Sequence, residues 1–244
     1  MKVFLDTNVF YNDWFMKNAN FKYLFHFLNN EGHELIVSKL VIEETENIRK
    51  REVRESLSEI KKHLKKVQKL NPEKLSFDLT TIGIKDYELL HLLKGRVENI
   101  KEIGYENITH SEVVKRAFLN KKPFMNGEKG YRDTLIWLSC LDHIIEDKIN
   151  EDIVFITKNK SDFFKVKDNV VRFHEDLNRD IIERKIDTKI IPFTSLFDFV
   201  NSTIDKDDHA IDHYKSEEIF EEFIEDFAVD FLEGMSNIDL SKYL

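Results

Sequence analysis

Four acidic side chains in this sequence lie where apolar runs begin or end. Asp6 closes the aliphatic run 3–5 and is followed by Thr7 and Asn8. The other acids come much later and belong to separate apolar segments: Glu44, Asp133 and Asp162. Carboxylates that converge without a cation repel one another, which raises their pKa values. Because Mg²⁺ and Mn²⁺ prefer carboxylate and water oxygens, the pattern predicts a site for one of these ions.

Each acid also fits a simpler structural role. Asp6 and Asp162 could cap turns after strands, and Asp133 could complement a helix dipole from the first turn. Glu44 shares the apolar stripe of its helix and could reach solvent from the stripe's edge. Taken singly, none of the four decides between these roles and a site, so the prediction rests on their joint occurrence at two strand ends and two helix starts.

The elements that would position these acids follow from the apolar periodicity. Strands are expected at 3–6, 33–38, 152–157, 169–173 and 188–193. Helices are expected at 13–30, from a Ser38 cap to Leu70, across most of 75–120, at 131–147 and at 216–234, with a loop at 121–130. Strands separated by helices predict an α/β fold, a three-layer α/β/α sandwich around a parallel sheet of four to five strands. Sites in such sheets lie beyond the carboxyl ends of the strands, where Asp6 falls.

Composition excludes several classes of protein. The single cysteine, Cys140, allows no disulfide framework and no cysteine-based zinc site, and it fits a cytoplasmic protein. No run of 18 apolar residues occurs, so no membrane span is expected. The net charge is −9, but residues 205–244 hold 13 acids and 3 lysines, a net of −10. Residues 1–204 are therefore nearly neutral, at −9 + 10 = +1.

These motifs resemble those of the PIN-domain family over residues 1 to about 195. The shared pattern is a first strand ending Asp6-Thr7-Asn8, a glutamate early in the second helix, an aspartate opening a later helix, and a strand ending Thr157-Lys158-Asn159 before Asp162-Phe163. The resemblance implies a Mg²⁺- or Mn²⁺-dependent nuclease that acts on single-stranded or structured RNA and leaves 5′-phosphate and 3′-hydroxyl ends.

Two features depart from the family pattern. Glu44 and Asp133 are 89 residues apart, so a helical insertion is expected at about 50–120 of a nuclease domain spanning 1–204. Position 159 is Asn where some members have Asp, so Asp162 is expected to supply the fourth acid.

Roles can be assigned on this basis. Asp6, Glu44, Asp133 and Asp162 are the expected metal ligands and catalytic residues. Thr7, Asn8, Thr157 and Asn159 are expected to contact substrate phosphate or to orient the acids. Lys129 and Arg132, with Lys121 and Lys122, are expected to contact substrate beside Asp133.

Other readings stay open. The chain could be a non-catalytic PIN-like module that binds RNA or a protein, or a haloacid-dehalogenase-like phosphatase, which would want Asp where Asn8 stands. The nuclease could be a toxin or defence effector with an antitoxin or regulatory partner, or a homodimer. The lysines of 61–69 could follow a phosphate backbone or form a solvated helix face. The acidic helix 216–234 could pack on the domain, shield a basic groove or bind a partner.

Overall fold

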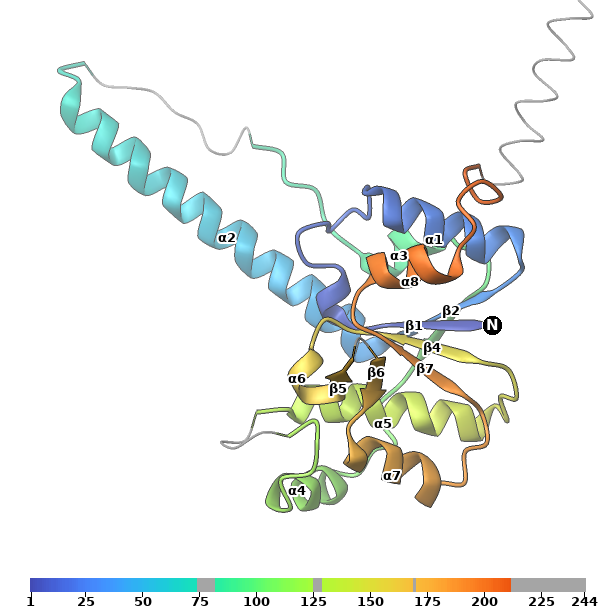
Figure 1. Ribbon diagram of the computed structural model, residues 1–244. Helices are drawn as coiled ribbons and strands as arrows, with labels where there is room; N and C mark the ends of the chain where they lie inside the picture. The colour runs from blue at the N-terminus through green and yellow to red at the C-terminus, as the bar shows by residue number, and fades with distance from the viewer. Residues whose placement is uncertain (74–81, 125–128, 169, 212–244) are drawn as a thin grey trace, which may run out of the picture.

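A sheet of five parallel strands forms the centre of the molecule (Figure 1). The computed structural model describes residues 1–73, 82–124, 129–168 and 170–211. The strand order is β3-β2-β1-β4-β7, and each neighbouring pair is parallel. The strands are β1 (Lys2–Leu5), β2 (Glu34–Ser38), β3 (Ile100–Ile103), β4 (Ile153–Ile156) and β7 (Ile190–Phe193).

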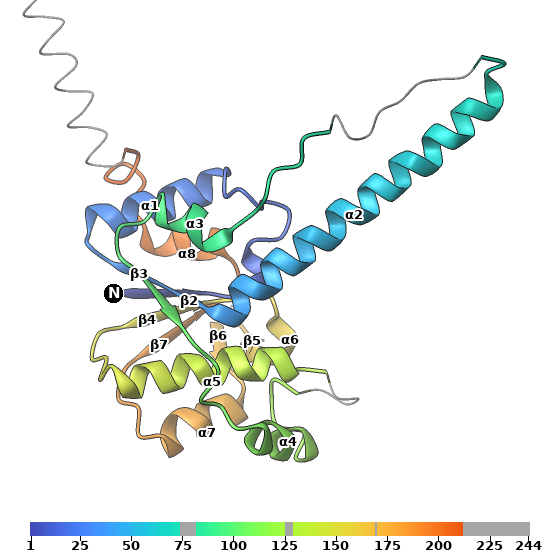
Figure 2. The ribbon, with the colours of Figure 1, turned by 180° about the vertical axis from the view of Figure 1, so that it is seen from behind.

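Helices cover both faces of the sheet. One face carries α1 (Ala19–Asn30), α3 (Leu89–Lys94) and α8 (Leu196–Thr203), and the other carries α4 (His110–Phe118), α5 (Tyr131–Glu146) and α7 (Glu175–Glu183) (Figures 1 and 2). The predicted three-layer sandwich is confirmed. Within the described ranges, no helix combines the length and the apolarity that crossing a bilayer requires.

Four short elements follow strands β1 and β4 at the carboxyl edge of the sheet. The 3-10 turn η1 (Thr7–Val9) follows β1, and α6 (Lys160–Phe163) follows β4. Beyond α6, β5 (Phe164–Lys167) and β6 (Val170–Phe173) form an antiparallel hairpin.

The core forms where the central strands meet α5. Strands β1 and β4 are buried on both faces, which is why they read as continuous apolar runs. Phe4 and Phe155 stack with ring centroids 5.1 Å apart, and Trp137 of α5 meets Phe155 edge-on at 5.7 Å. This packing fixes the ends of β1 and β4 and the start of α5 relative to one another.

Helix α2 (Lys39–Leu70) begins beside the sheet and extends away from the body as a single helix of 32 residues (Figure 1). Its predicted start and end are confirmed: the Ser38 side chain accepts a hydrogen bond from the Leu40 amide, and the helix stops at Asn71. The exposed part of this helix, residues 51–70, is called the arm below. Helix α1 begins at Ala19 rather than residue 13, because Asn18 caps it.

The prediction for the strand at the sheet's edge was wrong. Residues 75–120 were expected to be mostly helical, yet they contain β3, which pairs with β2. Only Ile103 of this strand is buried. Its two isoleucines, Ile100 and Ile103, are three residues apart, which is a spacing also typical of the apolar face of a helix. The strand expected at 169–173 corresponds to β6, which pairs with β5 in the hairpin and does not belong to the central five-stranded sheet. The helix expected at 216–234 lies outside the described residues.

Candidate active site

Asp6 ends β1 at the carboxyl edge of the sheet, and its side chain is 2% exposed. Its Oδ1 accepts from the Thr7 amide at 2.7 Å, and its Oδ2 accepts from Asn8 Nδ2 at 2.7 Å and Thr157 Oγ1 at 2.5 Å. Burial and the nearby charge of Asp133 raise the pKa of Asp6 to about 7, against the lowering effect of the Thr157 and Thr7 hydrogen bonds. Asp6 is therefore a carboxylate whose charge is only partly compensated.

Asn8 and Thr157 join the ends of β1 and β4. Asn8 Nδ2 also donates to Thr157 Oγ1 at 2.9 Å, and Asn8 Oδ1 accepts from the Lys158 amide at 2.8 Å. The Thr157 hydroxyl further accepts from the Asn159 amide at 3.0 Å. Asn8 and Thr157 were expected to contact substrate or to orient the acids, and the contacts that they make hold the Asp6 carboxylate in place.

Glu44 lies in the second turn of α2, and its side chain is 12% exposed. Thr7 Oγ1 donates to its Oε2 at 2.9 Å, which connects α2 to the end of β1. Its Oε1 forms an ion pair with Arg132, the exposed residue directly before Asp133. Arg132, which was expected to contact substrate, therefore lies among the predicted metal ligands.

Asp133 lies in the first turn of α5 and is partly buried. Burial and the charge of Asp162 raise its pKa to about 6; Glu44 adds to the rise, while a hydrogen bond with Asn159 opposes it. Asp133 is thus close to three other elements of the sheet edge. Together with the Asp6 interactions, this brings Asp6, Glu44, Asp133 and Asp162 into one group, called the carboxylate cluster below.

Asp162 lies in α6, and its side chain is 13% exposed. Ser161 Oγ donates to its Oδ1 at 3.3 Å, and Lys122 Nζ lies 3.7 Å from the same oxygen. Lys122 Nζ also donates to the Ser161 carbonyl at 2.7 Å. A cation from the loop before α5 therefore already faces this acid.

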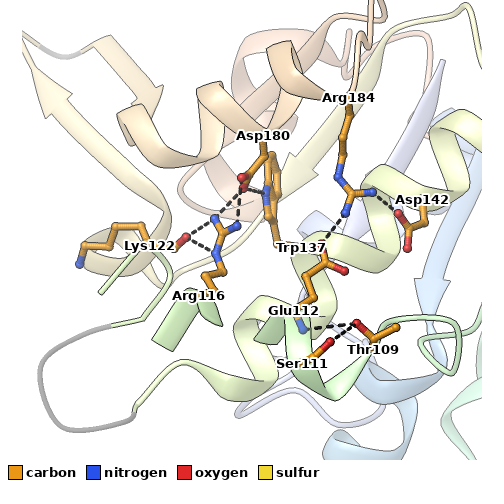
Figure 3. A network of polar contacts seen from close by, with 9 residues as sticks. All are labelled: Thr109, Ser111, Glu112, Arg116, Lys122, Trp137, Asp142, Asp180 and Arg184. Atoms are coloured by element: carbon orange, nitrogen blue, oxygen red, sulfur yellow. Dashed lines mark hydrogen bonds and ion pairs between the residues drawn. The ribbon is translucent and has the colours of Figure 1, made fainter. Parts of the chain in front are cut away.

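A buried polar network positions that loop (Figure 3). Arg116 of α4 donates to both carboxylate oxygens of Asp180 in α7, at 3.0 and 2.6 Å, and through Nε to the Lys122 carbonyl at 2.8 Å. Trp137 Nε1 also donates to Asp180, at 2.9 Å. Because one guanidinium contacts α7 and the Lys122 carbonyl together, the core fixes the position of Lys122. A second part of the network joins Thr109, Ser111, Glu112, Asp142 and Arg184.

One neighbour of the cluster was missed from the sequence. Burial raises the pKa of Tyr11 to about 12, with Glu44 and Asp6 adding to the rise. Tyr11 lies in an irregular loop without periodicity, so only its distance of five residues from Asp6 could have suggested it. The predicted Lys129 is exposed in the turn before α5.

The donor set fits a hard divalent cation. All four acids offer oxygen ligands. The charge of Asp133 raises the pKa of Asp6, the charges of Asp162 and Glu44 raise that of Asp133, and a bound cation would relieve this repulsion. As the described side chains stand, no three His, Cys, Asp or Glu residues already surround one point as ligands. The Arg132 guanidinium forms an ion pair with Oε1 of Glu44, which is one of the candidate metal-ligand oxygens.

Comparison with known proteins gives one match. A family model described as PIN domain matches residues 3–163, a range that includes the whole carboxylate cluster. No curated protein and no solved structure matches. Proteins with PIN domains are generally nucleases, which are hydrolases that act on nucleic acids and use divalent metals. Because the match covers more than half of the chain, this protein belongs to the PIN-domain family.

Proposed function

We propose that the protein is a metal-dependent endoribonuclease that hydrolyses RNA phosphodiester bonds at the carboxylate cluster, with residues 1–204 as the nuclease domain. The observation that carries the proposal is the mutual electrostatic contact of the acids at the sheet's carboxyl edge: Asp133 raises the pKa of Asp6, and Asp162 and Glu44 raise that of Asp133. A domain that only bound RNA would gain nothing from clustered negative charge.

Asp6, Glu44, Asp133 and Asp162 would hold Mg²⁺ or Mn²⁺. When bound, such an ion supplies a water of lowered pKa and neutralises charge that develops on phosphate oxygens. Attack by this water on phosphorus would leave 5′-phosphate and 3′-hydroxyl ends. No nucleophilic side chain is required, and the only cysteine, Cys140, is buried away from solvent.

The surrounding residues keep the acids oriented and charged. Hydrogen bonds from Thr7, Asn8 and Thr157 fix the orientation of the Asp6 carboxylate. The Thr7 hydroxyl likewise orients the Glu44 carboxylate by donating a hydrogen bond to it. Asn159 stabilises the charged form of Asp133. Fixed donors of this kind reduce the reorganisation that ion binding would otherwise demand.

Substrate contact is proposed for the cationic side chains at the start of α5. Arg132 and Lys129 precede Asp133, and Arg132 would exchange its Glu44 contact for a phosphate oxygen when an ion takes over Glu44. Lys122 beside Asp162 adds a third cation on the same side. The polar side chains Thr7, Asn8, Thr157 and Asn159 stay in the proposed set because they line the same edge.

The test is incubation of the purified protein with end-labelled RNA in Mn²⁺ or in chelator. Cleavage in Mn²⁺ is expected for the wild type and for Asp187→Asn, a matched control. Asp187 is exposed and comes before β7 at the opposite edge of the sheet. Asp133→Asn should lose at least a hundredfold in rate. Full activity of Asp133→Asn, or equal cleavage in chelator, would refute the proposal.

The alternative, a non-catalytic RNA- or protein-binding module, predicts a different result in the same assay. RNA would bind without cleavage, and Asp133→Asn would bind as well as the wild type or better. A toxin or defence role in the cytoplasm, with an antitoxin or a second copy as partner, extends the proposal. It predicts growth arrest on expression of the wild type and normal growth with Asp133→Asn.

A further inference from the structure

A hollow lined by residues of α1, by the end of α3 and the residues that follow it, and by Ala210 and Ile211 lies apart from the carboxylate cluster. Figure 2 shows α1 and α3 on the same face of the sheet. The hollow measures about 930 Å³. Its apolar lining includes the buried side chains of Met16, Phe25 and Val97. We call this hollow the α1–α3 groove. A groove with apolar walls and charged edges has the properties of a peptide-docking surface.

The charge of the groove is positive. Lys17, Lys22, Lys94 and Arg96 line it, with Glu98 as the only acid in the lining. Arg96 donates to the carbonyls of Phe15 and Met16, at 2.7 and 2.8 Å, and so is held at the edge by the backbone. Within the described ranges, Lys22 and Lys94 have no ion-pair partner and are exposed. The groove therefore favours an occupant that is acidic as well as apolar.

The chain itself leads into this groove. His209 is 5% exposed, its ring meets Phe27 edge-on at 5.3 Å, and its carbonyl is 3.0 Å from His26 Nδ1. Asn30 Nδ2 donates to the Ile211 carbonyl at 3.1 Å. Ala210 and Ile211, the last described residues, are part of the groove's lining. The point at which residues 212–244 leave the described structure is thus fixed at the groove by α1.

The sequence that follows has the chemistry that the groove favours. Residues 212–244 contain ten Asp and Glu residues and two Lys. Apolar pairs recur at 219/220, 223/224, 227/228 and 231/232, with acids between them. Glu217 comes six residues after Ile211, a reach of about 20 Å for extended chain. Because Ile211 is itself part of the lining, the first acids follow directly from the groove along the chain.

We propose that the α1–α3 groove binds the C-terminal segment 212–244 of the same chain. The acids of the segment lie against Lys17, Lys22, Lys94 and Arg96 at the edge of the groove, above a floor formed by Met16, Phe25 and Val97. The tether at Ile211 makes this contact intramolecular, so weak individual ion pairs suffice to keep the groove occupied. The proposal is independent of the nuclease chemistry.

The test is zero-length carbodiimide cross-linking of the full chain, in a 1:1 mixture of unlabelled and ¹⁵N-labelled protein. Cross-links are expected between Lys17, Lys22 or Lys94 and the acids of 217–233, within single isotopic species, and their yield should fall in high salt. The arm supplies an internal control, because it carries five exposed lysines: Lys61, Lys62, Lys65, Lys66 and Lys69.

Matched charge reversals sharpen the result. Lys22→Glu with Lys94→Glu should lower the groove cross-links at Lys17 by about fivefold or more, whereas Lys65→Glu with Lys66→Glu should leave them unchanged. Cross-links that favour the arm lysines, or that are absent from the groove, would overturn the proposal. Cross-links between differently labelled chains would assign the groove to a second copy, which also contradicts it.

Discussion

The substitution Asp133→Asn should make the metal-free protein more stable at neutral and alkaline pH. Burial and neighbouring carboxylates raise the pKa of Asp133 from its usual 3.8 to about 6 in the folded state. The folded state therefore favours the protonated form. The resulting cost to stability is absent below about pH 4, grows between pH 4 and 6, and is constant above pH 6. Asn removes the charge, keeps the shape and can still accept a hydrogen bond from Asn159.

The size of the effect follows from that rise in pKa. A rise of about 2 pH units corresponds to about 3 kcal/mol, at 1.36 kcal/mol for each unit. Because Asp133 is only partly buried, solvent screening reduces this to about 1–2 kcal/mol. In a chain of this length, that corresponds to a melting temperature about 2–8 °C higher.

Urea unfolding in chelator at pH 5 and pH 8 measures this difference, with Asp187→Asn as the matched control. Addition of Mn²⁺ should then reverse the order of stability. An ion at 100 times its Kd stabilises the wild type by about 2.7 kcal/mol, and the variant lacks one of its ligands. If Asp133→Asn were less stable than the wild type in chelator at pH 8, the claim that this carboxylate is strained by its neighbours would be wrong.

Three further predictions concern other residues. Mn²⁺ should bind about tenfold more tightly at pH 8 than at pH 6, because Asp6, with a pKa of about 7, must lose its proton before it can bind the ion. Isothermal titration calorimetry measures this difference. An affinity that does not depend on pH would exclude Asp6 as a ligand. Arg116→Met should lower the free energy of unfolding by about 3–5 kcal/mol in urea titrations, because it leaves the buried Asp180 carboxylate without its ion-pair partner; a loss below about 1 kcal/mol would contradict this. Gly130→Ala should lower the melting temperature, because Gly130 has φ +112° and an added Cβ would lie 2.6 Å from the Pro123 carbonyl oxygen; an unchanged melting temperature would show that the turn adjusts.

The central strands and the acids at their ends were predictable because local sequence determines both. Strands β1 and β4 are short, buried except for Lys2, and followed directly by polar residues, so Asp6 and Thr157 could be placed without tertiary information. The same holds for Glu44 and Asp133, whose positions within a helix follow from a cap and an apolar stripe. The cluster is a consequence of parallel topology, which brings these ends to one edge.

Edge elements and long-range polar contacts were not predictable in this way. Strand β3 depends on pairing with β2 rather than on its own pattern, since three of its four residues remain accessible. The Arg132–Glu44 ion pair joins residues 88 positions apart, and nothing in either local sequence indicates it. Arg116 and Asp180 are charged residues, which usually lie at the surface, yet both are buried here because they form an ion pair with each other.

Helix α2 connects the carboxylate cluster to the most basic stretch of the described chain. Glu44 lies near its start, and Lys65 lies 21 residues further along, which at 1.5 Å per residue is about 32 Å. Because the helix is unbroken, the distance between its two ends is fixed. Under the proposed nuclease function, a nucleic acid that contacted both ends would be cut at a set distance from its contact with the arm, so the fragment lengths would depend on the length of the helix.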